Sequence, residues 1–350
     1  MKDSVIILHE YGAPNHFRGL IYLLNNHNIR YAFYELDWWV KIKRGLKQGS
    51  VSMIWRGIRN LMFLQILPLL QSRKIILSTA PFNPQMVQLR RKLKKHQSYF
   101  FISYTIWDQS SYVHDYHNDE RILTEWRDFL LNDVSHIFVV SEKTKAEMIK
   151  NHFATANKVS VVNHSYHIKP TPKFYQKKTN SFIAVGGLTR HKGTEELLDI
   201  FSKRPELKLT LVGKGDLLNI VQEYCKKYSN IIYKGFITNQ EELFSIYQQS
   251  SFFILNSHRT NIWEELFGMV LIESSACGLV PVATDHSGPK EIIHNGIDGF
   301  ICKEGDIISG IEKCISLSET EFSAMRQSAI VNGQQYHEAK ISIKWSDVLS

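Results

Sequence analysis

Short apolar runs alternate along the chain with stretches in which apolar residues recur at the spacing of a helix face. This alternation is typical of α/β proteins with parallel sheets, because a parallel crossover needs a connection of a dozen residues or more, usually a helix. We therefore predict an α/β fold. Strands are expected near 5–8, 30–36, 75–77, 99–104, 136–140 and 159–162, and again near 182–185, 207–212, 231–233, 252–255 and 280–283.

The two series of strands predict two domains. At 350 residues the chain exceeds the size that one hydrophobic core usually supports. Between the series, Pro170, Pro172 and a lysine-rich run without a period are typical of a linker. We predict a first domain over 1–165, a linker over 166–180 and a second domain over 181–335. Doubly wound domains bind ligands at the carboxyl ends of their strands, so the ligand is expected in the cleft between them.

Composition excludes several classes of protein. Hydrophobic residues make up 43% of the chain and charged residues 22%, which is ordinary for a globular protein and too apolar for disorder. No run of 18 uncharged apolar residues predicts a membrane span, and the apolar run at 5–8 is too short for a signal peptide. The four cysteines form no CxxC pair, so we expect no disulfide framework or zinc site and a reducing cytoplasm.

The net charge of +8 is concentrated in the first half. Residues 1–170 contain 23 Lys and Arg against 13 Asp and Glu, and 38–107 contain 13 basic residues and no acidic one. One interpretation is a solvated basic face. The other is attraction of this half to an anionic surface.

The first candidate site is the segment VGGLTRHKGTEELL, 185–198. A strand ends at Val185, Gly186 and Gly187 follow, and a helix begins after Gly193. Glycines let backbone N–H groups approach a ligand closely, and a helix N-terminus adds partial positive charge. With Arg190 and Lys192 nearby, the segment suits a diphosphate. A purely structural turn is the alternative.

The second candidate site is EELFGMVLIESSACGLVPVAT, 264–284. If its helix begins near Gly268, Glu265 lies in the preceding loop and Glu273 about one and a half turns along the helix. Apolar neighbours predict a buried helix, in which a carboxylate needs a partner. Ribose hydroxyls suit Glu273 and sugar hydroxyls suit Glu265. The alternative is a surface-facing Glu273 in a plain amphipathic helix.

The order of these motifs resembles glycosyltransferase family 4, the retaining GT-B enzymes. The resemblance covers about 120 residues, from VGGLTRHKG through LVGKGD, YKGFI, the pair Glu265 and Glu273, and TDHSGPKEII to NGIDGF. In the first half, HEYGAPNHFRGL and FVVSEKTKAEM agree with it more weakly. It implies two Rossmann-like doubly wound domains facing each other across a cleft. Lys344 and Trp345 are similar to the family's last helix, which implies that 336–350 cross back to the first domain.

The resemblance also implies roles for individual residues. Lys192 would bind the donor diphosphate, Glu273 the ribose hydroxyls and Glu265 the transferred sugar. The remaining donor-binding residues would be Gly12, Gly186, Gly187, Gly213, Gly215, Phe236, Ile237, Phe267, Gly268, Met269 and Val270.

Two positions depart from the family pattern. The family usually has an arginine where Gly187 stands, and Arg190 is the candidate to replace its charge. Trp107 takes the place of the histidine in a His-Asp pair, so that only Asp108 remains. His9 or His114 could substitute for that histidine, or each is an ordinary polar-loop histidine.

The expected mechanism stabilises the leaving diphosphate electrostatically. Lys192, Arg190 and helix N-termini supply positive charge without a metal, and no DxD-like pair stands in a plausible metal-binding loop. No cofactor is expected besides the donor, with UDP or GDP as its nucleotide. Since no carboxylate nucleophile stands out in the first domain, we favour front-face attack.

The acceptor is expected at the first domain. Segments 38–47, 52–70 and 88–97 combine Trp, Leu and Lys or Arg in amphipathic patterns that suit an anionic lipid surface. Core helices with basic outer faces are the alternative. We expect a saccharide or lipid-linked acceptor in surface polysaccharide or lipopolysaccharide assembly, and a cytoplasmic protein peripheral to the inner face of the membrane.

Three rival functions remain open. A GT-B nucleotide-sugar epimerase shares the architecture but needs no basic, aromatic first domain. A catalytically silent binding subunit would explain the departures at Gly187 and Trp107, although Lys192, Glu265 and Glu273 are all retained. Nucleic-acid binding could use the basic half, but no recognised nucleic-acid motif is present, so none is expected as a partner.

Overall fold

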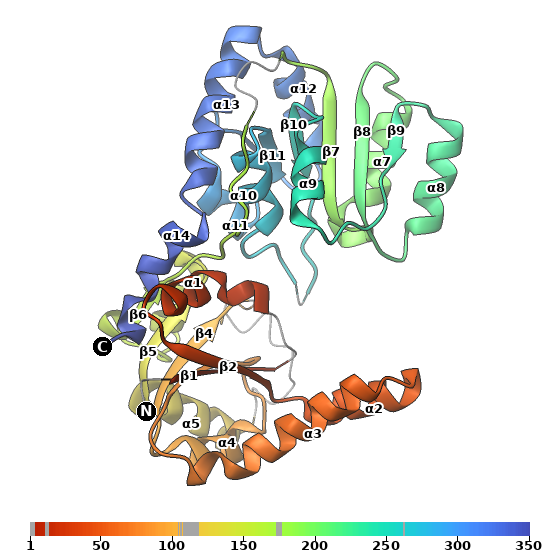
Figure 1. Ribbon diagram of the computed structural model, residues 1–350. Helices are drawn as coiled ribbons and strands as arrows, with labels where there is room; N and C mark the ends of the chain where they lie inside the picture. The colour runs from red at the N-terminus through yellow and green to blue at the C-terminus, as the bar shows by residue number, and fades with distance from the viewer. Residues whose placement is uncertain are drawn as a thin grey trace. The chain divides into compact units, whose positions relative to one another are not determined.

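The computed structural model describes residues 4–10, 14–103, 105, 107, 119–172, 177–261 and 263–350. The chain forms two compact units. Unit 1 comprises 1–164 and 339–350, and unit 2 comprises 165–338. Each unit contains one six-stranded sheet with helices on both faces (Figure 1), which confirms the predicted α/β class.

The sheet of unit 1 has the strand order β2-β1-β3-β4-β5-β6, and every neighbouring pair is parallel. The order reverses direction between β1 and β3, where a doubly wound sheet opens a binding crevice. Its strands are β1 (Ser4–His9), β2 (Arg30–Glu35), β3 (Lys74–Ser78), β4 (Gln97–Ile102), β5 (Val134–Val139) and β6 (Val159–Val161).

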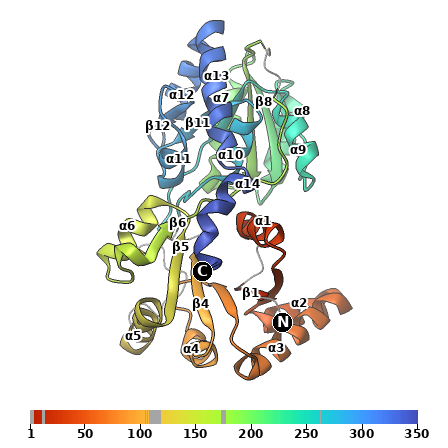
Figure 2. The same cartoon turned by 60° about the vertical axis from the view of Figure 1, so that its left-hand side comes forward.

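Alternate residues of these strands face two separate layers. On one face, Ile6, Leu8, Phe100 and Ile102 join the core formed with α3, α4 and α5. On the other face, Phe101 packs against Trp345 at 4.9 Å between ring centroids. Figure 2 shows α4 and α5 beside β4 and β5. The helices of unit 1 are α1 (Arg18–Asn26), α2 (Trp38–Gln48), α3 (Val51–Ile66), α4 (Met86–Leu93), α5 (Glu120–Asp128) and α6 (Glu142–Lys150).

The end of the chain belongs to unit 1. After α14 (Glu338–Ile341), the 3-10 helix η7 (Ser342–Val348) packs on α1. Gly19 of α1 allows this contact, because a Cβ there would lie 3.0 Å from Ile341. Trp345 is buried, and the Tyr99 hydroxyl donates to the Asp347 carbonyl at 3.0 Å. These contacts hold residues 339–350 on the sheet of unit 1.

The sheet of unit 2 has the order β12-β11-β10-β7-β8-β9, again parallel throughout. This is the order of a Rossmann fold, and its switch point lies between β7 and β10. Its strands are β7 (Ser181–Gly187), β8 (Lys208–Lys214), β9 (Ile231–Tyr233), β10 (Phe252–Leu255), β11 (Val280–Thr284) and β12 (Phe300–Cys302).

Helices cover both faces of this sheet. Leu197, Val221 and Ile311 bring α7, α8 and α12 into one core with β7 and β10. On the opposite face, Tyr247 of α9 packs on Phe253 of β10 at 6.0 Å. The helices of unit 2 are α7 (Thr194–Ser202), α8 (Leu218–Lys227), α9 (Gln240–Tyr247), α10 (Met269–Ala276), α11 (Ser287–Ile292), α12 (Ile307–Ser316) and α13 (Glu319–Gln334).

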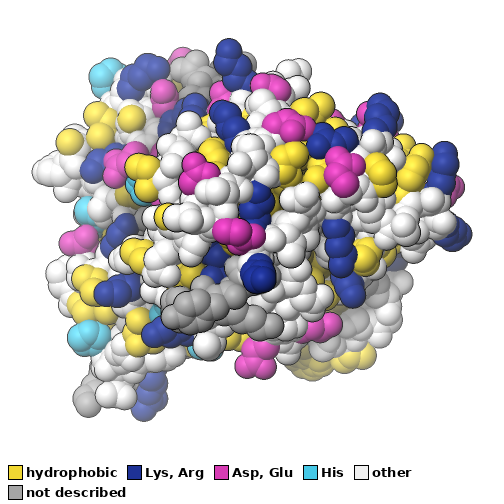
Figure 3. All heavy atoms as spheres, turned by 90° about the horizontal axis from the view of Figure 1, so that it is seen from above, with side chains coloured by type: hydrophobic (Ala, Val, Ile, Leu, Met, Phe, Trp, Pro, Cys, Tyr) yellow, Lys and Arg dark blue, Asp and Glu magenta, His cyan; other side chains and the backbone are white. Residues whose placement is uncertain are grey.

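Charge is mixed over the face of the molecule shown in Figure 3, where basic and acidic side chains are interspersed. Among the described residues, no helix combines the length and the apolar character that crossing a bilayer requires.

Candidate functional site

The carboxyl ends of β7 and β10, at the switch point of unit 2, hold the strongest cluster of predicted site residues. After β7 the chain turns through the 3-10 helix η6 (Arg190–Lys192) and Gly193 into α7. Gly193 has φ +64°, and a Cβ there would lie 2.3 Å from Asn256, just past β10. A glycine is therefore required for this turn to approach β10, and the approach brings Lys192 to the switch point.

Lys192 and Glu265 are brought together here. The Lys192 ammonium pairs with a carboxylate oxygen of Glu265 and lies 4.5 Å from the centroid of the Trp263 ring. The Ser257 hydroxyl donates to the same Glu265 oxygen at 3.3 Å. The Lys192 side chain is only 23% exposed. Since an ammonium has three N–H donors, Lys192 can bind an anion while Glu265 fixes its position.

The loop that carries Glu265 is held by two residues of the TDHSGP segment. The Glu265 backbone N–H donates to His286 Nδ1 at 3.1 Å, and His286 Nε2 donates to the Ser257 carbonyl at 2.8 Å. Burial lowers the pKa of His286, which agrees with this neutral tautomer. Gly288 lies so close that a Cβ would be 2.3 Å from the Phe267 nitrogen. The TDHSGP segment thus positions Glu265.

The helix α10 begins directly after this loop. Gly268 has φ +88° and caps the helix, and its carbonyl accepts from the Leu271 N–H at 2.9 Å. Met269 and Val270 form the first turn and are half-buried. The N–H groups of a first helical turn have no partner within the helix, and the helix dipole makes this end positive. Phe267 to Val270 therefore provide an end suited to an anion.

Glu273 is buried, with 8% of its surface exposed, so the alternative of a surface-facing side chain does not hold. Gln240 Nε2 donates to Glu273 Oε1 at 2.9 Å. Burial raises the pKa values of Tyr166 and Tyr247, and the nearby Glu273 and Cys277 raise them further. Glu265 and Glu273 thus have different partners, Lys192 and Gln240 respectively.

The predicted glycines draw the ends of β7 and β8 together. Gly186 and Gly213 are neighbours in the β7–β8 ladder, with φ near +146° and +147°. A Cβ on Gly213 would lie 1.8 Å from the Gly186 carbonyl oxygen, and one on Gly215 would lie 2.3 Å from that of Leu188. A cavity of about 20 Å³ lies beside this junction, between Gly186, Gly187, Lys192 and Asn256.

Phe236 and Ile237 follow β9 at the same edge of the sheet. Phe236 is 54% exposed, and the Lys214 ammonium lies 4.1 Å from its ring centroid. Ile237 is half-buried. An exposed aromatic ring of this kind suits stacking by a nucleobase.

The structure does not bring Arg190 into the contact between Lys192 and Glu265. Its side chain is 82% exposed, and its guanidinium pairs with Glu195 at 3.0 Å. A Cβ on Gly187 would meet only Thr189, at an ordinary 3.7 Å. Replacement of the family arginine by Arg190 stays a prediction.

Trp107 cannot take over the role of the family histidine, because its side chain lies in the core of unit 1. It is fully buried, and its ring centroid lies 4.9 Å from that of Phe153 and 5.7 Å from that of Trp126. Its φ of +66° is rare for a bulky residue. Gly12, Asp108 and His114 lie outside the described residues.

His9 is the last residue of β1, not a loop residue, and belongs to a buried cluster. The rings of His9 and His16 are 6.2 Å apart, and those of His16 and His164 are 4.5 Å apart. The Ser103 hydroxyl lies 3.1 Å from His16 Nδ1. Burial lowers the pKa of His9 and of His16 to about 4 and that of His164 to about 3.

We expect this cluster to make the protein less stable in mild acid. The unfolded chain takes up these protons near pH 6.5, whereas the folded form takes them up only near pH 3 to 4. The stability is therefore complete above pH 7 and is lost as the pH falls toward 4, by up to about 1.4 kcal/mol per pH unit for each proton. Urea unfolding between pH 7.5 and 4.5 measures the slope. His164→Gln should reduce it, and an unchanged slope in that variant would contradict the assignment.

Several residues of the site were not predicted from the sequence: Trp263, Ser257, Gln240, Lys214 and His286. Lys214 could have been found, because it stands between the predicted Gly213 and Gly215. The other residues reach the site through contacts with residues that are distant from them in the sequence.

Comparison with known proteins agrees with this geometry. Residues 169–336 match the model of the family described as Glycosyl transferases group 1. Residues 169–336 belong to this family. The capsular polysaccharide biosynthesis glycosyltransferase CapM of Staphylococcus aureus is 26% identical over 61% of the chain and 60% of that relative. The amylovoran biosynthesis glycosyltransferase AmsD of Erwinia amylovora is 29% identical over 59% of the chain and 58% of that relative.

The chain thus spans about three fifths of the length of these curated relatives of the group 1 family. Among solved structures, Anabaena HepE in complex with UDP matches with a TM-score of 0.68 at 15% identity, over 99% of each chain. Sucrose-phosphate synthase of Thermosynechococcus elongatus matches with a TM-score of 0.70 at 14% identity, over 99% of this chain and 98% of that one. These structural matches confirm the predicted GT-B fold. The match of residues 169–336 confirms the predicted family for that part of the chain.

Proposed function

We propose that the protein is a retaining glycosyltransferase that moves a sugar from a nucleotide diphosphate sugar to a saccharide acceptor. The observation that carries the proposal is the Lys192 ammonium, held by Glu265 at the switch point of a Rossmann-type sheet. A cation fixed there suits the negative charge that develops on a departing diphosphate.

In the proposed reaction, the bond between the anomeric carbon and the diphosphate oxygen breaks while the acceptor oxygen attacks from the same face. The acceptor proton passes to the departing phosphate oxygen. Lys192 and the positive end of α10 stabilise the leaving group, and Glu265 accepts hydrogen bonds from the sugar hydroxyls. No carboxylate nucleophile is used, so trapping a covalent sugar on the protein would overturn this route.

The donor nucleotide is proposed to be UDP, with GDP as the second candidate. In HepE, one of the solved structures of similar length, the nucleotide bound is UDP. In this chain Glu273 would bind the ribose hydroxyls, with Gln240 beside it, and Phe236 would stack on the base.

Glu273→Gln is expected to weaken UDP binding about 10- to 100-fold, because a hydrogen bond to a charged group contributes about 1.5–3 kcal/mol. Isothermal titration of UDP and GDP into the full chain measures this change. Glu223→Gln, at an exposed position of α8, is the matched control and should bind normally. Equal affinities in both variants would contradict the ribose assignment, provided that both melt like the parent protein.

The acceptor is proposed to be a growing surface saccharide. CapM and AmsD are described as enzymes of capsular polysaccharide and amylovoran biosynthesis, and the structural match WaaB as a lipopolysaccharide outer core galactosyltransferase. We propose that the acceptor saccharide is attached to a lipid. The enzyme would then act as a peripheral protein at the inner face of the membrane.

The helices α2 and α3 support this peripheral position. Trp39, Lys43 and Leu46 share one face of α2, and Trp39 and Leu46 are 50% and 67% exposed. Exposed Trp and Leu beside basic residues suit the interface of an anionic bilayer.

We expect the full chain to float with vesicles that contain phosphatidylglycerol and to be released at high salt, because screening weakens the attraction. Trp39→Glu combined with Leu46→Glu should lower the bound fraction severalfold. Val331→Glu changes an equally exposed apolar residue in unit 2 and should have no effect. Binding that ignores both charge and these residues would refute the membrane proposal.

A further inference from the structure

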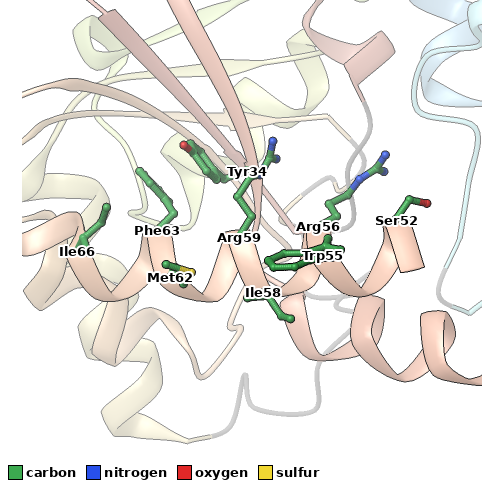
Figure 4. Close-up of a pocket in the computed structure, with 9 residues that line it drawn as sticks. All are labelled: Tyr34, Ser52, Trp55, Arg56, Ile58, Arg59, Met62, Phe63 and Ile66. Atoms are coloured by element: carbon green, nitrogen blue, oxygen red, sulfur yellow. The ribbon is translucent and has the colours of Figure 1, made fainter. Parts of the chain in front are cut away.

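A second cavity lies in unit 1 and is lined by none of the proposed donor-site residues. It is an open groove of about 590 Å³ along α3, a volume typical of small-molecule sites. Figure 4 shows its lining: Tyr34 of β2 above the helix, and a row of α3 side chains. The α3 residues are Ser52, Trp55, Arg56, Ile58, Arg59, Met62, Phe63 and Ile66.

The groove rests on a rigid hairpin. Gly45 and Gly57 let α2 and α3 pack closely, since a Cβ would lie 2.7 Å from Ile54 or 2.5 Å from Ile42 respectively. The hairpin is fastened to β2 by polar contacts. Asn60 donates to Glu35 at 3.3 Å, and Arg59 donates to the Phe33 carbonyl at 2.9 Å.

Along α3, apolar side chains line one side of the groove and two arginines line the side next to Tyr34. Trp55, Met62 and Ile66 are 65%, 61% and 47% exposed, although each lines a concave surface. Arg56 and Arg59 point to the same side of α3 in Figure 4, and Arg59 lies 5.0 Å from the Tyr34 ring. Among the residues that the structure describes, none of those lining the groove is acidic. This combination is complementary to a hydrocarbon chain that ends in an anionic group.

The arginine side of the groove lies near the end of β2, because Arg59 donates to the Phe33 carbonyl. Phe33 and Tyr34 precede Glu35, the last residue of β2, which pairs in the ladder with His9 at the end of β1. Doubly wound sheets bind ligands at these carboxyl ends. A chain in the groove with its anionic group at Arg56 and Arg59 would therefore present an attached saccharide toward this edge.

We propose that the groove binds one lipid phosphate, with its hydrocarbon chain along Trp55, Met62 and Ile66 and its phosphate at Arg56 and Arg59. The proposal rests on the proposed glycosyl transfer and deepens it, because it assigns the lipid part of the acceptor to a discrete site. The occupant is a single lipid molecule and not the bilayer surface.

The test is isothermal titration of the full chain with farnesyl phosphate below its aggregation concentration. Farnesol and inorganic phosphate serve as the chain-only and charge-only probes. We expect one farnesyl phosphate per chain, and at least tenfold weaker binding of either half molecule. Trp55→Glu and Met62→Glu should each weaken binding at least tenfold, whereas Arg56→Gln should mainly reduce the preference for farnesyl phosphate over farnesol.

Two matched controls separate the groove from general surface effects. Leu69→Glu alters a residue that is 81% exposed outside the groove, and Arg44→Gln removes an exposed cation of α2. Both should bind farnesyl phosphate normally. Equal weakening in controls and groove variants, or no binding at all, would overturn the proposal. So would a dimer in sedimentation that Met62→Glu dissociates, since the groove would then be an interface between copies.

Donor hydrolysis is measured in the same samples, so that the two proposals can fail separately. Saturable binding of farnesyl phosphate without donor hydrolysis would support the groove proposal and contradict the transferase proposal. Donor hydrolysis without binding of farnesyl phosphate would support the transferase proposal and overturn the groove proposal.

Discussion

Replacing Lys192 with alanine is expected to lower the rate of donor cleavage about 10²- to 10³-fold, the usual effect of removing one group that stabilises developing negative charge. Lys192 is held by Glu265 and lies beside the Trp263 ring, so its charge is fixed before the donor binds. A preorganised cation needs no rearrangement when the diphosphate departs. The change should therefore appear in kcat as well as in kcat/KM.

Steady-state kinetics with the productive donor measure this effect. Lys203→Ala removes a lysine that is 70% exposed and paired with Asp199, also in unit 2, and should leave the rate within about twofold. Melting temperatures exclude unfolding as the cause. A Lys192→Ala enzyme with normal kcat would show that the leaving group is stabilised elsewhere.

Replacing Gly213 with alanine is expected to destabilise unit 2 by about 3 kcal/mol or more, because two independent costs coincide. The φ of +147° is unfavourable for a residue with a Cβ, and that Cβ would lie 1.8 Å from the Gly186 carbonyl oxygen. The β7–β8 ladder would have to separate where the donor site begins.

Thermal unfolding tests this prediction, with an expected loss of about 6–12 °C at the size of unit 2. Gly187→Ala is the matched control, because Gly187 lies in β7, the strand that pairs with the one containing Gly213. Its Cβ would meet nothing closer than 3.7 Å, and its φ is not positive. If both substitutions lower the melting temperature equally, the close approach at Gly213 is not what limits stability.

Most elements of the fold were predictable because most strands are distinct apolar runs, but the short edge strand β12 (Phe300–Cys302) was not among the predicted strands. The residues at which the strands end were less predictable. The strand β7 was expected to end at residue 185 but continues to Gly187, and β8 continues to Lys214. Glycine has little intrinsic preference for strands, and the extension comes from pairing between the two glycine-containing ends, which a single sequence does not reveal.

The site was predictable where chemistry is local in the sequence and not where it depends on packing. The pairing of Lys192 with Glu265 joins residues that are 73 positions apart. The support from His286 and the burial of Trp107 likewise depend on tertiary contacts. Amphipathic patterns predicted the basic helices, but the groove on α3 results from how Tyr34 of β2 packs against Phe63.

The most direct test of the account is proton NMR of the purified full chain with a panel of UDP-, GDP-, ADP-, dTDP- and CMP-sugars. The account predicts that one donor, with UDP first among the candidates, binds and is slowly hydrolysed, and that the first sugar released keeps the anomeric configuration of the donor. Release of the opposite anomer would contradict retention. A folded protein that binds none of the donors would contradict the proposed transferase and favour a binding subunit that has lost catalysis.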